Sequence, residues 1–197
     1  CLGDLTALFI FPLFYPGYDC RIQPVRALGA AGSPIARIVS LWWIFMGLIF
    51  LLFAFAYGKC NYTHQPGHSL TAWLIGIYAV GEEIGSGVFP GNHLSGHLTT
   101  TGIIHNVVGG IGVIALIAVP FAVMKKYTRA SYPALNRVIR IISISGIFLF
   151  FLFTVSRLHF PGAERLRSWH GLWQRLFVAN YYILFIVIAF KLVGECR

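Results

Sequence analysis

Long runs of apolar residues alternate with short polar connections along this chain of 197 residues. None of the runs alternates apolar and polar residues with the period of two that a membrane β-barrel strand requires. A helix needs about 20 residues to cross the hydrocarbon core of a bilayer, and inside that core every backbone group must be paired within its own segment. The pattern therefore predicts six transmembrane helices, at residues 1–15, 38–57, 70–89, 101–124, 138–155 and 176–193.

The first run is the shortest and is closed by Pro12 and Pro16. It needs a few residues before Cys1 to reach the length of a membrane span. Because the chain starts with Cys1 and not with Met, we interpret its beginning as truncated or processed.

The composition agrees with a membrane protein and excludes an ordinary soluble domain. Hydrophobic residues make up 57% of the chain and charged residues 11%, against about 25% charged residues in soluble domains. The mean hydropathy is +0.75. We therefore expect one all-α transmembrane domain over residues 1–197, an integral membrane bundle of six helices.

The net charge of +9 would suggest nucleic acid in a soluble protein. In a membrane protein, basic loops instead set the orientation and contact anionic lipid headgroups, so we expect membrane lipids and no nucleic acid as partners. All four lysines lie on the side that carries the second and fourth connections. We expect that side to be cytoplasmic and the membrane to be the inner membrane. The four cysteines are scattered and predict neither a zinc ribbon nor a disulfide framework.

Two adjacent acids, Glu82 and Glu83, lie within the third apolar run, and His105 lies within the fourth. Both positions are roughly 10 Å below the connection that joins the two runs, at 1.5 Å per residue. We therefore predict that one of the glutamates, with Glu82 preferred, contacts His105. Intramembrane acids are costly and often functional, so these three residues are our catalytic candidates, in proton exchange. The alternative is a structural ion pair with Arg157.

The connection between these runs carries His93 and His97, four residues apart, which would place two metal ligands on one face of a helix. With His105 and a glutamate they would form a zinc site with an open position, as hydrolases require. Gly91, and Ser95-Gly96 between the two histidines, favour an ordinary loop instead.

The opposite face to the lysines is predicted to be the outer face, and it carries many arginines. Arg157, His170 and Arg175 flank the last connection, and Asp19 lies in the first connection, on the same face. Arginine binds phosphate groups bidentately. We therefore predict that these four residues form a binding site for a lipid headgroup, with nonspecific headgroup contact as the simpler alternative.

Three elements in order resemble the DUF998 family of small multi-pass membrane proteins. They are Tyr15-Pro16-Gly17-Tyr18-Asp19 with Leu28-Gly29-Ala30-Ala31-Gly32-Ser33-Pro34, Gly87-Val88-Phe89-Pro90 with Ile104-His105-Asn106, and Gly171-Leu172-Trp173-Gln174-Arg175-Leu176. The resemblance implies a six-helix bundle without an assigned activity. It also implies a distant similarity to the Frag1/DRAM/Sfk1 membrane proteins, some of which are linked to lipid handling. The chain departs from the family pattern at Asn92, where an acid is usual, and at Glu82-Glu83, where the span is usually apolar.

The leading hypothesis is an integral membrane protein that binds or handles a lipid headgroup at a polar site on the outer face. A zinc-dependent membrane hydrolase is the main alternative. A structural or accessory subunit, which would work with a protein partner, is the third. Enzymatic and non-enzymatic functions both stay open at this point.

Overall fold

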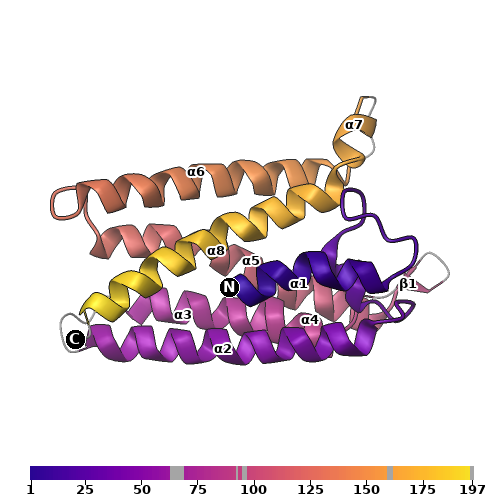
Figure 1. Ribbon diagram of the computed structural model, residues 1–197, viewed down its shortest axis with the longest axis horizontal. Helices are drawn as coiled ribbons and strands as arrows, with labels where there is room; N and C mark the ends of the chain where they lie inside the picture. The colour runs from indigo at the N-terminus through magenta and orange to yellow at the C-terminus, as the bar shows by residue number, and fades with distance from the viewer. Residues whose placement is uncertain (63–68, 92, 95–96, 159–161, 196–197) are drawn as a thin grey trace.

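The computed structural model describes residues 1–62, 69–91, 93–94, 97–158 and 162–195. Within these residues it is built of helices and one short strand pair, which confirms the all-α prediction. Four long helices run along an elongated bundle (Figure 1), namely α2 (Ala36–Tyr62), α5 (Thr100–Lys126), α6 (Pro133–Val155) and α8 (His170–Glu195).

These four helices are also the ones that, by length and composition, can cross a membrane among the described residues. The spans are Ala36–Cys60, Thr100–Lys126, Pro133–Val155 and His170–Glu195. They correspond to the second, fourth, fifth and sixth predicted spans. The first and third predicted spans are helical as well, but neither forms an α-helix of that length.

The third span is interrupted by a change of helix type. It consists of α3 (Ser69–Tyr78), the π-helix η4 (Ala79–Ile84) and α4 (Gly85–Val88), which follow one another without a break. A π-helical turn closes its hydrogen bonds one residue later than an α-helix does, and such turns are frequent at functional sites. Hydropathy alone did not predict it, and η4 is the segment that carries both glutamates.

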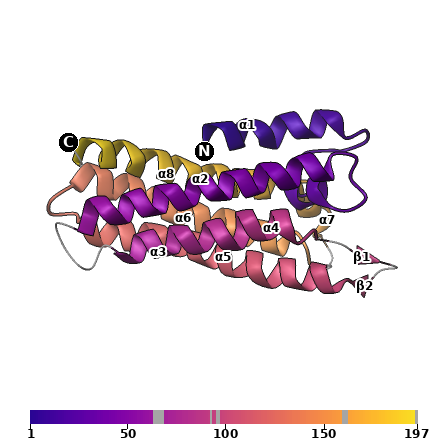
Figure 2. The same ribbon diagram turned by 90° about the horizontal axis from the view of Figure 1, so that it is seen from below.

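The first span is short because α1 (Leu2–Ile10) tightens into the 3₁₀-helix η1 (Phe11–Phe14). Its amino terminus lies about halfway along the bundle in Figures 1 and 2. From this position α1 packs beside α2 and α8, with Leu8 in a cluster with Val25 and Val39. The buried face of α1 therefore reaches only one half of the bundle.

The connections at one end contain the remaining elements. They are the 3₁₀-helix η2 (Val25–Gly29), the antiparallel strands β1 (His93–Leu94) and β2 (His97–Leu98), and the short α7 (Glu164–Arg167). His93 and His97 belong to two paired strands, so the helical turn that would place both on one face as metal ligands is not formed. Helix α5 then starts at Thr100. Thr99 is its N-cap, and the Thr99 side chain accepts a hydrogen bond from the Gly102 amide at 3.1 Å.

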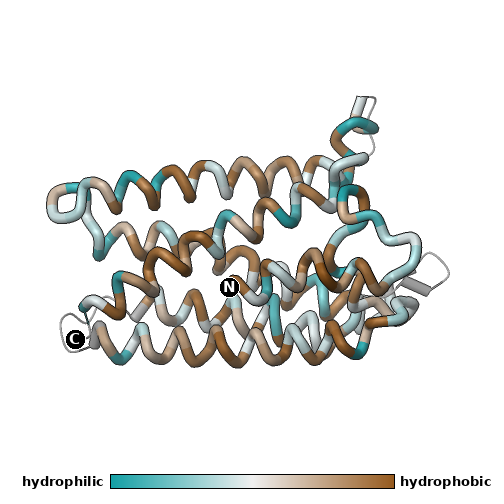
Figure 3. Tube along the Cα trace, in the orientation of Figure 1, coloured by the Kyte–Doolittle hydropathy of each residue, from teal (hydrophilic) through white to brown (hydrophobic). Residues whose placement is uncertain are grey.

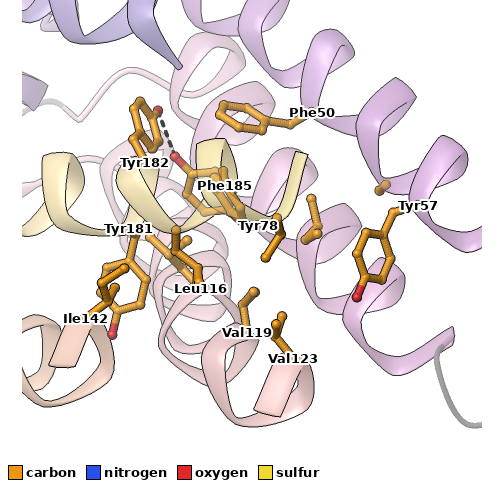
Figure 4. Packing of buried hydrophobic residues seen from close by; sticks show 14 of the residues in the cluster. Phe50, Tyr57, Tyr78, Leu116, Val119, Val123, Ile142, Tyr181, Tyr182 and Phe185 are labelled. Carbon is orange, nitrogen blue, oxygen red and sulfur yellow. Dashed lines mark hydrogen bonds between the residues drawn. The ribbon is translucent and has the colours of Figure 1, made fainter. Parts of the chain in front are cut away.

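The core is a column of aromatic and branched side chains from α2, α3, α5, α6 and α8 (Figure 4). Phe50, Tyr78 and Phe185 lie against one another with ring centroids 5.3–5.9 Å apart. Several core positions are tyrosines, and a buried hydroxyl needs a hydrogen-bond partner. The hydroxyls of Tyr78 and Tyr182 face each other within this core, as the dashed line in Figure 4 marks.

The outer surface of the helices is apolar. Leu52, Phe55, Ile144 and Phe190 are more than two-thirds exposed, as expected for helices that face lipid. Figure 3 shows apolar residues along the helices and polar residues mainly at the two ends of the bundle.

Candidate functional site

A cavity of about 320 Å³ lies between η4, α5, α6 and α8. It is at the end of the bundle that we call the arginine end, after Arg26 and Arg157, and the end with Lys126 and Lys191 is the lysine end. The polar residues lining the cavity include Arg26, Glu82, His105, Asn106, Arg157 and Gln174. The apolar residues include Val113, Ile114, Leu116, Phe150, Phe153, Phe177 and Val178. One cavity thus combines charged groups with an apolar wall.

The π-helix η4 is held directly against α5 by glycines. A Cβ on Gly81 would lie 2.7 Å from the Val108 carbonyl oxygen and 2.9 Å from the Gly112 Cα. A Cβ on Gly112 would lie 2.5 Å from the Glu82 amide nitrogen. Backbones can approach this closely only where side chains are absent. The contact therefore fixes the height at which the two glutamates enter the bundle.

Glu83 points into a cluster of polar side chains that borders a small cavity of about 50 Å³, which Glu82 and Arg26 also line. Its Oε1 atom accepts hydrogen bonds from the Tyr78 hydroxyl at 2.5 Å and the Tyr182 hydroxyl at 2.9 Å. The Tyr182 hydroxyl also lies 2.7 Å from Asp4 Oδ2, and Trp42 Nε1 donates to Asp4 Oδ1 at 2.6 Å. Asp4 is 4% exposed and Glu83 5% exposed. The cluster joins α1, α2, the third span and α8 inside the membrane region.

The hydroxyl groups of this cluster supply fewer hydrogen atoms than there are close oxygen–oxygen contacts. Tyr78 and Tyr182 bring one hydroxyl proton each, but four oxygen–oxygen contacts of 3.0 Å or less connect Asp4, Glu83 and the two tyrosines. A single hydroxyl proton cannot point fully at two carboxylates. A carboxyl proton on Asp4 or Glu83 would raise the number of hydrogens to three for these four contacts, so the cluster links the helices and has room to hold a proton.

Glu82 has a different environment, although it is the next residue. Its carboxylate lines the 320 Å³ cavity and lies against α5, where a Cβ on Gly109 would be 2.8 Å from Glu82 Oε2. Arg26 and Arg157 line the same cavity. Among the residues that the structure describes, no ion pair within 4.0 Å joins Glu82 to either arginine. Three charges therefore face a shared space without direct pairing.

Both arginines are in connections outside the spanning helices and keep their charge at neutral pH. Desolvation, helped by Arg26 and opposed by Glu82, lowers the pKa of Arg157 to about 10. Desolvation also lowers the pKa of Arg26, and Glu82 opposes that shift. Arg157 lies over the ring of Phe153 at 4.5 Å, and Gln174 Oε1 accepts from the amide of Val25, next to Arg26, at 2.8 Å. The two cations are thus positioned by α6 and α8.

His105 lines the same cavity, but the predicted contact with Glu82 is not among the hydrogen bonds of the described residues. Its Nδ1 atom lies 2.9 Å from the carbonyl oxygen of Phe89. Because a carbonyl oxygen only accepts, Nδ1 carries the hydrogen, and Nε2 of the neutral ring is an acceptor. Glu82 and His105 therefore face the same cavity, and the hydrogen bond of His105 goes to the turn after α4.

All the hydrogen-bond partners of the Arg175 guanidinium in the described structure are groups of the protein. It is 1% exposed, and its guanidinium donates to the carbonyls of Cys20, Gln23 and Gly171 at 2.8–3.1 Å and to the Tyr18 hydroxyl at 2.9 Å. Gly171 has no room for a side chain because the carbonyls of Cys20 and Gln23 lie against it. The Gly-Leu-Trp-Gln-Arg element therefore clamps the first connection to α8.

Asp19 and His170 are also placed outside the cavity wall. Asp19 forms an ion pair with Arg21 at 3.0 Å, and hydrogen bonds from Arg21 lower the pKa of the Asp19 carboxyl. His170 is buried, with Nδ1 2.6 Å from the hydroxyl of Ser156 and its ring stacked on Phe153. Of the four residues predicted to bind a headgroup, Arg157 is the one that lines the cavity.

In the described part of the chain, no group of three or more metal-binding side chains comes together. The side chains of His93 and His97 lie outside the described residues, so the zinc site with His105 stays a prediction. Zinc would require those imidazoles, because His105 and Glu82 are two of the three or four ligands that such a site needs.

Arg26 and Gln174 in the cavity, and the partners of Glu83, were not predicted from the sequence. Asp4, Tyr78 and Tyr182 come from distant parts of the chain and meet only in the fold. The sequence did indicate that Asp4 has a partner, because a carboxylate inside an apolar run needs one. Arg26 had none, since an arginine in a loop is ordinary.

No curated protein and no solved structure matches this chain. A family model described as a protein of unknown function (DUF998) matches residues 2–191. This match and the apolar helices make it a multi-pass integral membrane protein, while the similarity to the Frag1/DRAM/Sfk1 proteins stays a prediction. The match covers nearly all of the chain, and the chain therefore belongs to the DUF998 family of membrane proteins.

Proposed function

We propose that this protein binds a membrane phospholipid in the 320 Å³ cavity, with the phosphate at Arg26 and Arg157 and an acyl chain along the apolar wall. One observation carries the proposal. Arg26 and Arg157, which in the described part of the chain form no ion pair with Glu82, line the same cavity as a wall of apolar side chains. Guanidinium groups bind phosphate bidentately. Ligand cavities with a few placed polar groups and a mainly apolar lining are typical binding sites.

The shape of the lining supports an elongated ligand. Along α5 the cavity wall runs from His105 to Leu116, roughly 16 Å at 1.5 Å per residue. The polar residues lie near the arginine end, and the phenylalanines Phe150 and Phe177 lie deeper. A molecule with a charged head and a hydrocarbon tail matches this order.

The cavity also borders the surface that faces the membrane. Gly110 and Thr154, which line it from α5 and α6, are exposed, and Ile114 is 68% exposed. A lipid could therefore enter sideways from the bilayer without crossing water. This supports binding or handling of a lipid more than hydrolysis of a soluble substrate.

The proposal includes the membrane arrangement. We propose one transmembrane domain with six membrane-embedded helical segments in the cytoplasmic membrane, four of them full α-helical spans and the first and third irregular. The lysines favour the lysine end as cytoplasmic. Cys60, at the same end, is disulfide-bonded, although the scattered cysteines predicted no disulfide framework. Disulfides are typical of an oxidising compartment. Labelling of Cys20, a free thiol at the arginine end, with an impermeant maleimide on intact cells decides between the two orientations.

The proposal is tested by the phospholipid that stays with the purified protein. The full chain is purified in a mild detergent, and bound phospholipid is measured by phosphate analysis and native mass spectrometry. The double variant Arg26→Gln, Arg157→Gln removes both cations from the cavity. We expect it to retain less than a fifth of the lipid bound by the unaltered protein.

The matched control is the double variant Arg37→Gln, Arg165→Gln, which removes two exposed arginines that do not line the cavity. It should retain the lipid. Equal retention by both double variants, or the absence of lipid from the unaltered protein after reconstitution with phospholipid, would overturn the proposal.

A further inference from the structure

The cavity contains charged side chains of both signs, and the side chains that the structure describes there do not pair directly with one another. Arg26 and Arg157 contribute two positive charges and Glu82 one negative charge. Within the described residues these groups form no hydrogen bond or close ion pair with one another. A carboxylate inside a membrane region that lacks a close partner is costly. Whatever fills the cavity must therefore offer a partner to Glu82 as well as to the arginines.

The acceptors lie on one wall and the donors come from other elements. Glu82 and His105 Nε2 are acceptors on η4 and α5, while Arg26 and Arg157 are donors from η2 and the end of α6. A phosphate group alone satisfies the arginines and repels Glu82. A ligand that joins an anion to a nearby group with N–H donors satisfies both sets.

We propose that the lipid headgroup is a phosphodiester with a primary ammonium group, as in an ethanolamine phospholipid, and that Glu82 binds the ammonium. This inference rests on the proposed function. A primary ammonium has three N–H donors, enough for the Glu82 carboxylate and His105 Nε2 together. Its hydrogen bonds to a carboxylate are charge-assisted and about twice as strong as neutral ones. A choline group carries the same charge but no N–H donor.

Gly109 provides the room for this contact. A Cβ at this position would lie 2.8 Å from Glu82 Oε2, whereas a Cβ on the neighbouring Gly110 meets nothing within 4 Å. Alanine at 109 would displace the Glu82 carboxylate without removing any charge. Alanine at 76, in α3, is its matched control, because a Cβ there would meet only Leu51 Cδ2 at 4.0 Å and Gly76 does not line the cavity.

The test compares four lipids with identical acyl chains and ethanolamine, N-methylethanolamine, N,N-dimethylethanolamine or choline headgroups. Their affinities for the full-length protein are measured by native mass spectrometry in detergent. We expect at least a tenfold preference for ethanolamine over choline, lost stepwise as each N–H is replaced. Glu82→Gln and Gly109→Ala should reduce this preference to less than threefold, and Gly76→Ala should keep it.

The outcomes separate this inference from the proposed function. Equal affinity for ethanolamine and choline lipids, with both lost in the Arg26→Gln, Arg157→Gln variant, would overturn the ammonium assignment and leave the lipid site standing. Absence of binding for all four lipids would overturn both. A phosphatidylglycerol of the same chain length is the further comparison. If it binds as tightly as the ethanolamine lipid and depends equally on Glu82, the donor is a hydroxyl and the ammonium assignment is wrong.

Discussion

Glu82 and Glu83 are neighbours in the chain and line one small cavity with Arg26, but the fold gives the two carboxylates different partners. Glu83 is enclosed with Asp4 and accepts hydrogen bonds from two tyrosine hydroxyls. Glu82 faces a cavity that it shares with Arg26 and Arg157. A carboxylate with short hydrogen bonds from packed helices stabilises the bundle. A carboxylate with space in front of it is available to a ligand. The comparison separates a structural acid from a binding acid within a single π-helical turn.

The largest effect should come from a change that disturbs both glutamates at once. Gly112→Val places a side chain against the backbone at Glu82 and Gly81, which cannot move without shifting η4. Overpacking typically lowers the free energy of unfolding by about 1–3 kcal/mol and occasionally more. For Gly112→Val we expect that free energy to fall by about 3 kcal/mol or more. The measurement is the thermal midpoint in detergent, followed by size-exclusion chromatography.

Gly110→Val is the control for this variant, because it makes the same substitution on the same helix at a position with open space. Similar thermal midpoints for the two variants would show that the contact between η4 and α5 does not support the site.

The next effect extends the comparison to the arginines. Arg175 donates hydrogen bonds to three carbonyl groups and the Tyr18 hydroxyl, whereas Arg157 faces the cavity. Arg175→Gln should lower the free energy of unfolding by about 2–3 kcal/mol, because hydrogen bonds of a charged group contribute about 1.5–3 kcal/mol to stability. The first connection should then detach locally. In a Cys1→Ser background, the labelling rate of Cys20 by a maleimide should rise at least tenfold.

Arg157→Gln should leave the Cys20 labelling rate unchanged. An increase of equal size in both variants would mean that the clamp is not specific to Arg175, and the distinction between bound and available arginines would fail.

A smaller effect is expected for the hydroxyl between the two enclosed acids. Tyr182→Phe leaves Asp4 and Glu83 without their shared donor, and an unsatisfied buried group costs about 1–3 kcal/mol. We expect a loss of about 1–2 kcal/mol in the free energy of unfolding, measured by denaturation in mixed detergent. Tyr181 is equally buried, and its hydroxyl has no partner among the described residues. Tyr181→Phe should therefore be neutral, and a loss equal to that of Tyr182→Phe would contradict the role of the cluster.

The smallest effect is the direct comparison of the two glutamates. Glu82→Ala should keep or raise the free energy of unfolding, because Glu82 has no hydrogen bond to lose within the described residues and an intramembrane carboxylate without a close partner is costly. Glu83→Ala should destabilise the protein about as much as Tyr182→Phe. The same denaturation measurement ranks them. If Glu82→Ala lowered the free energy of unfolding more than Glu83→Ala does, the assignment of Glu83 as the structural acid would be wrong.

The membrane class, the helical fold and the family were predictable from the sequence, because they depend on long apolar runs and on ordered local motifs. The position of His105 was predictable too, by counting residues from the turn at Phe89. The partners of Glu83 were not, since Asp4 and Tyr182 are far away in the chain and meet only when α1 and α8 pack together. The burial of Arg175 was hidden for the same reason, because its partners are backbone carbonyls of a distant loop.

By itself, the sequence determined that this chain enters a membrane as helices and that two acids and a histidine lie within them. Apolar length and the need to pair every backbone group leave no other solution. Only the tertiary structure decided which acid is enclosed and which faces the cavity. That choice depends on the π-helical turn and on the glycine contact between η4 and α5, which set the direction of each side chain against helices that are remote in sequence.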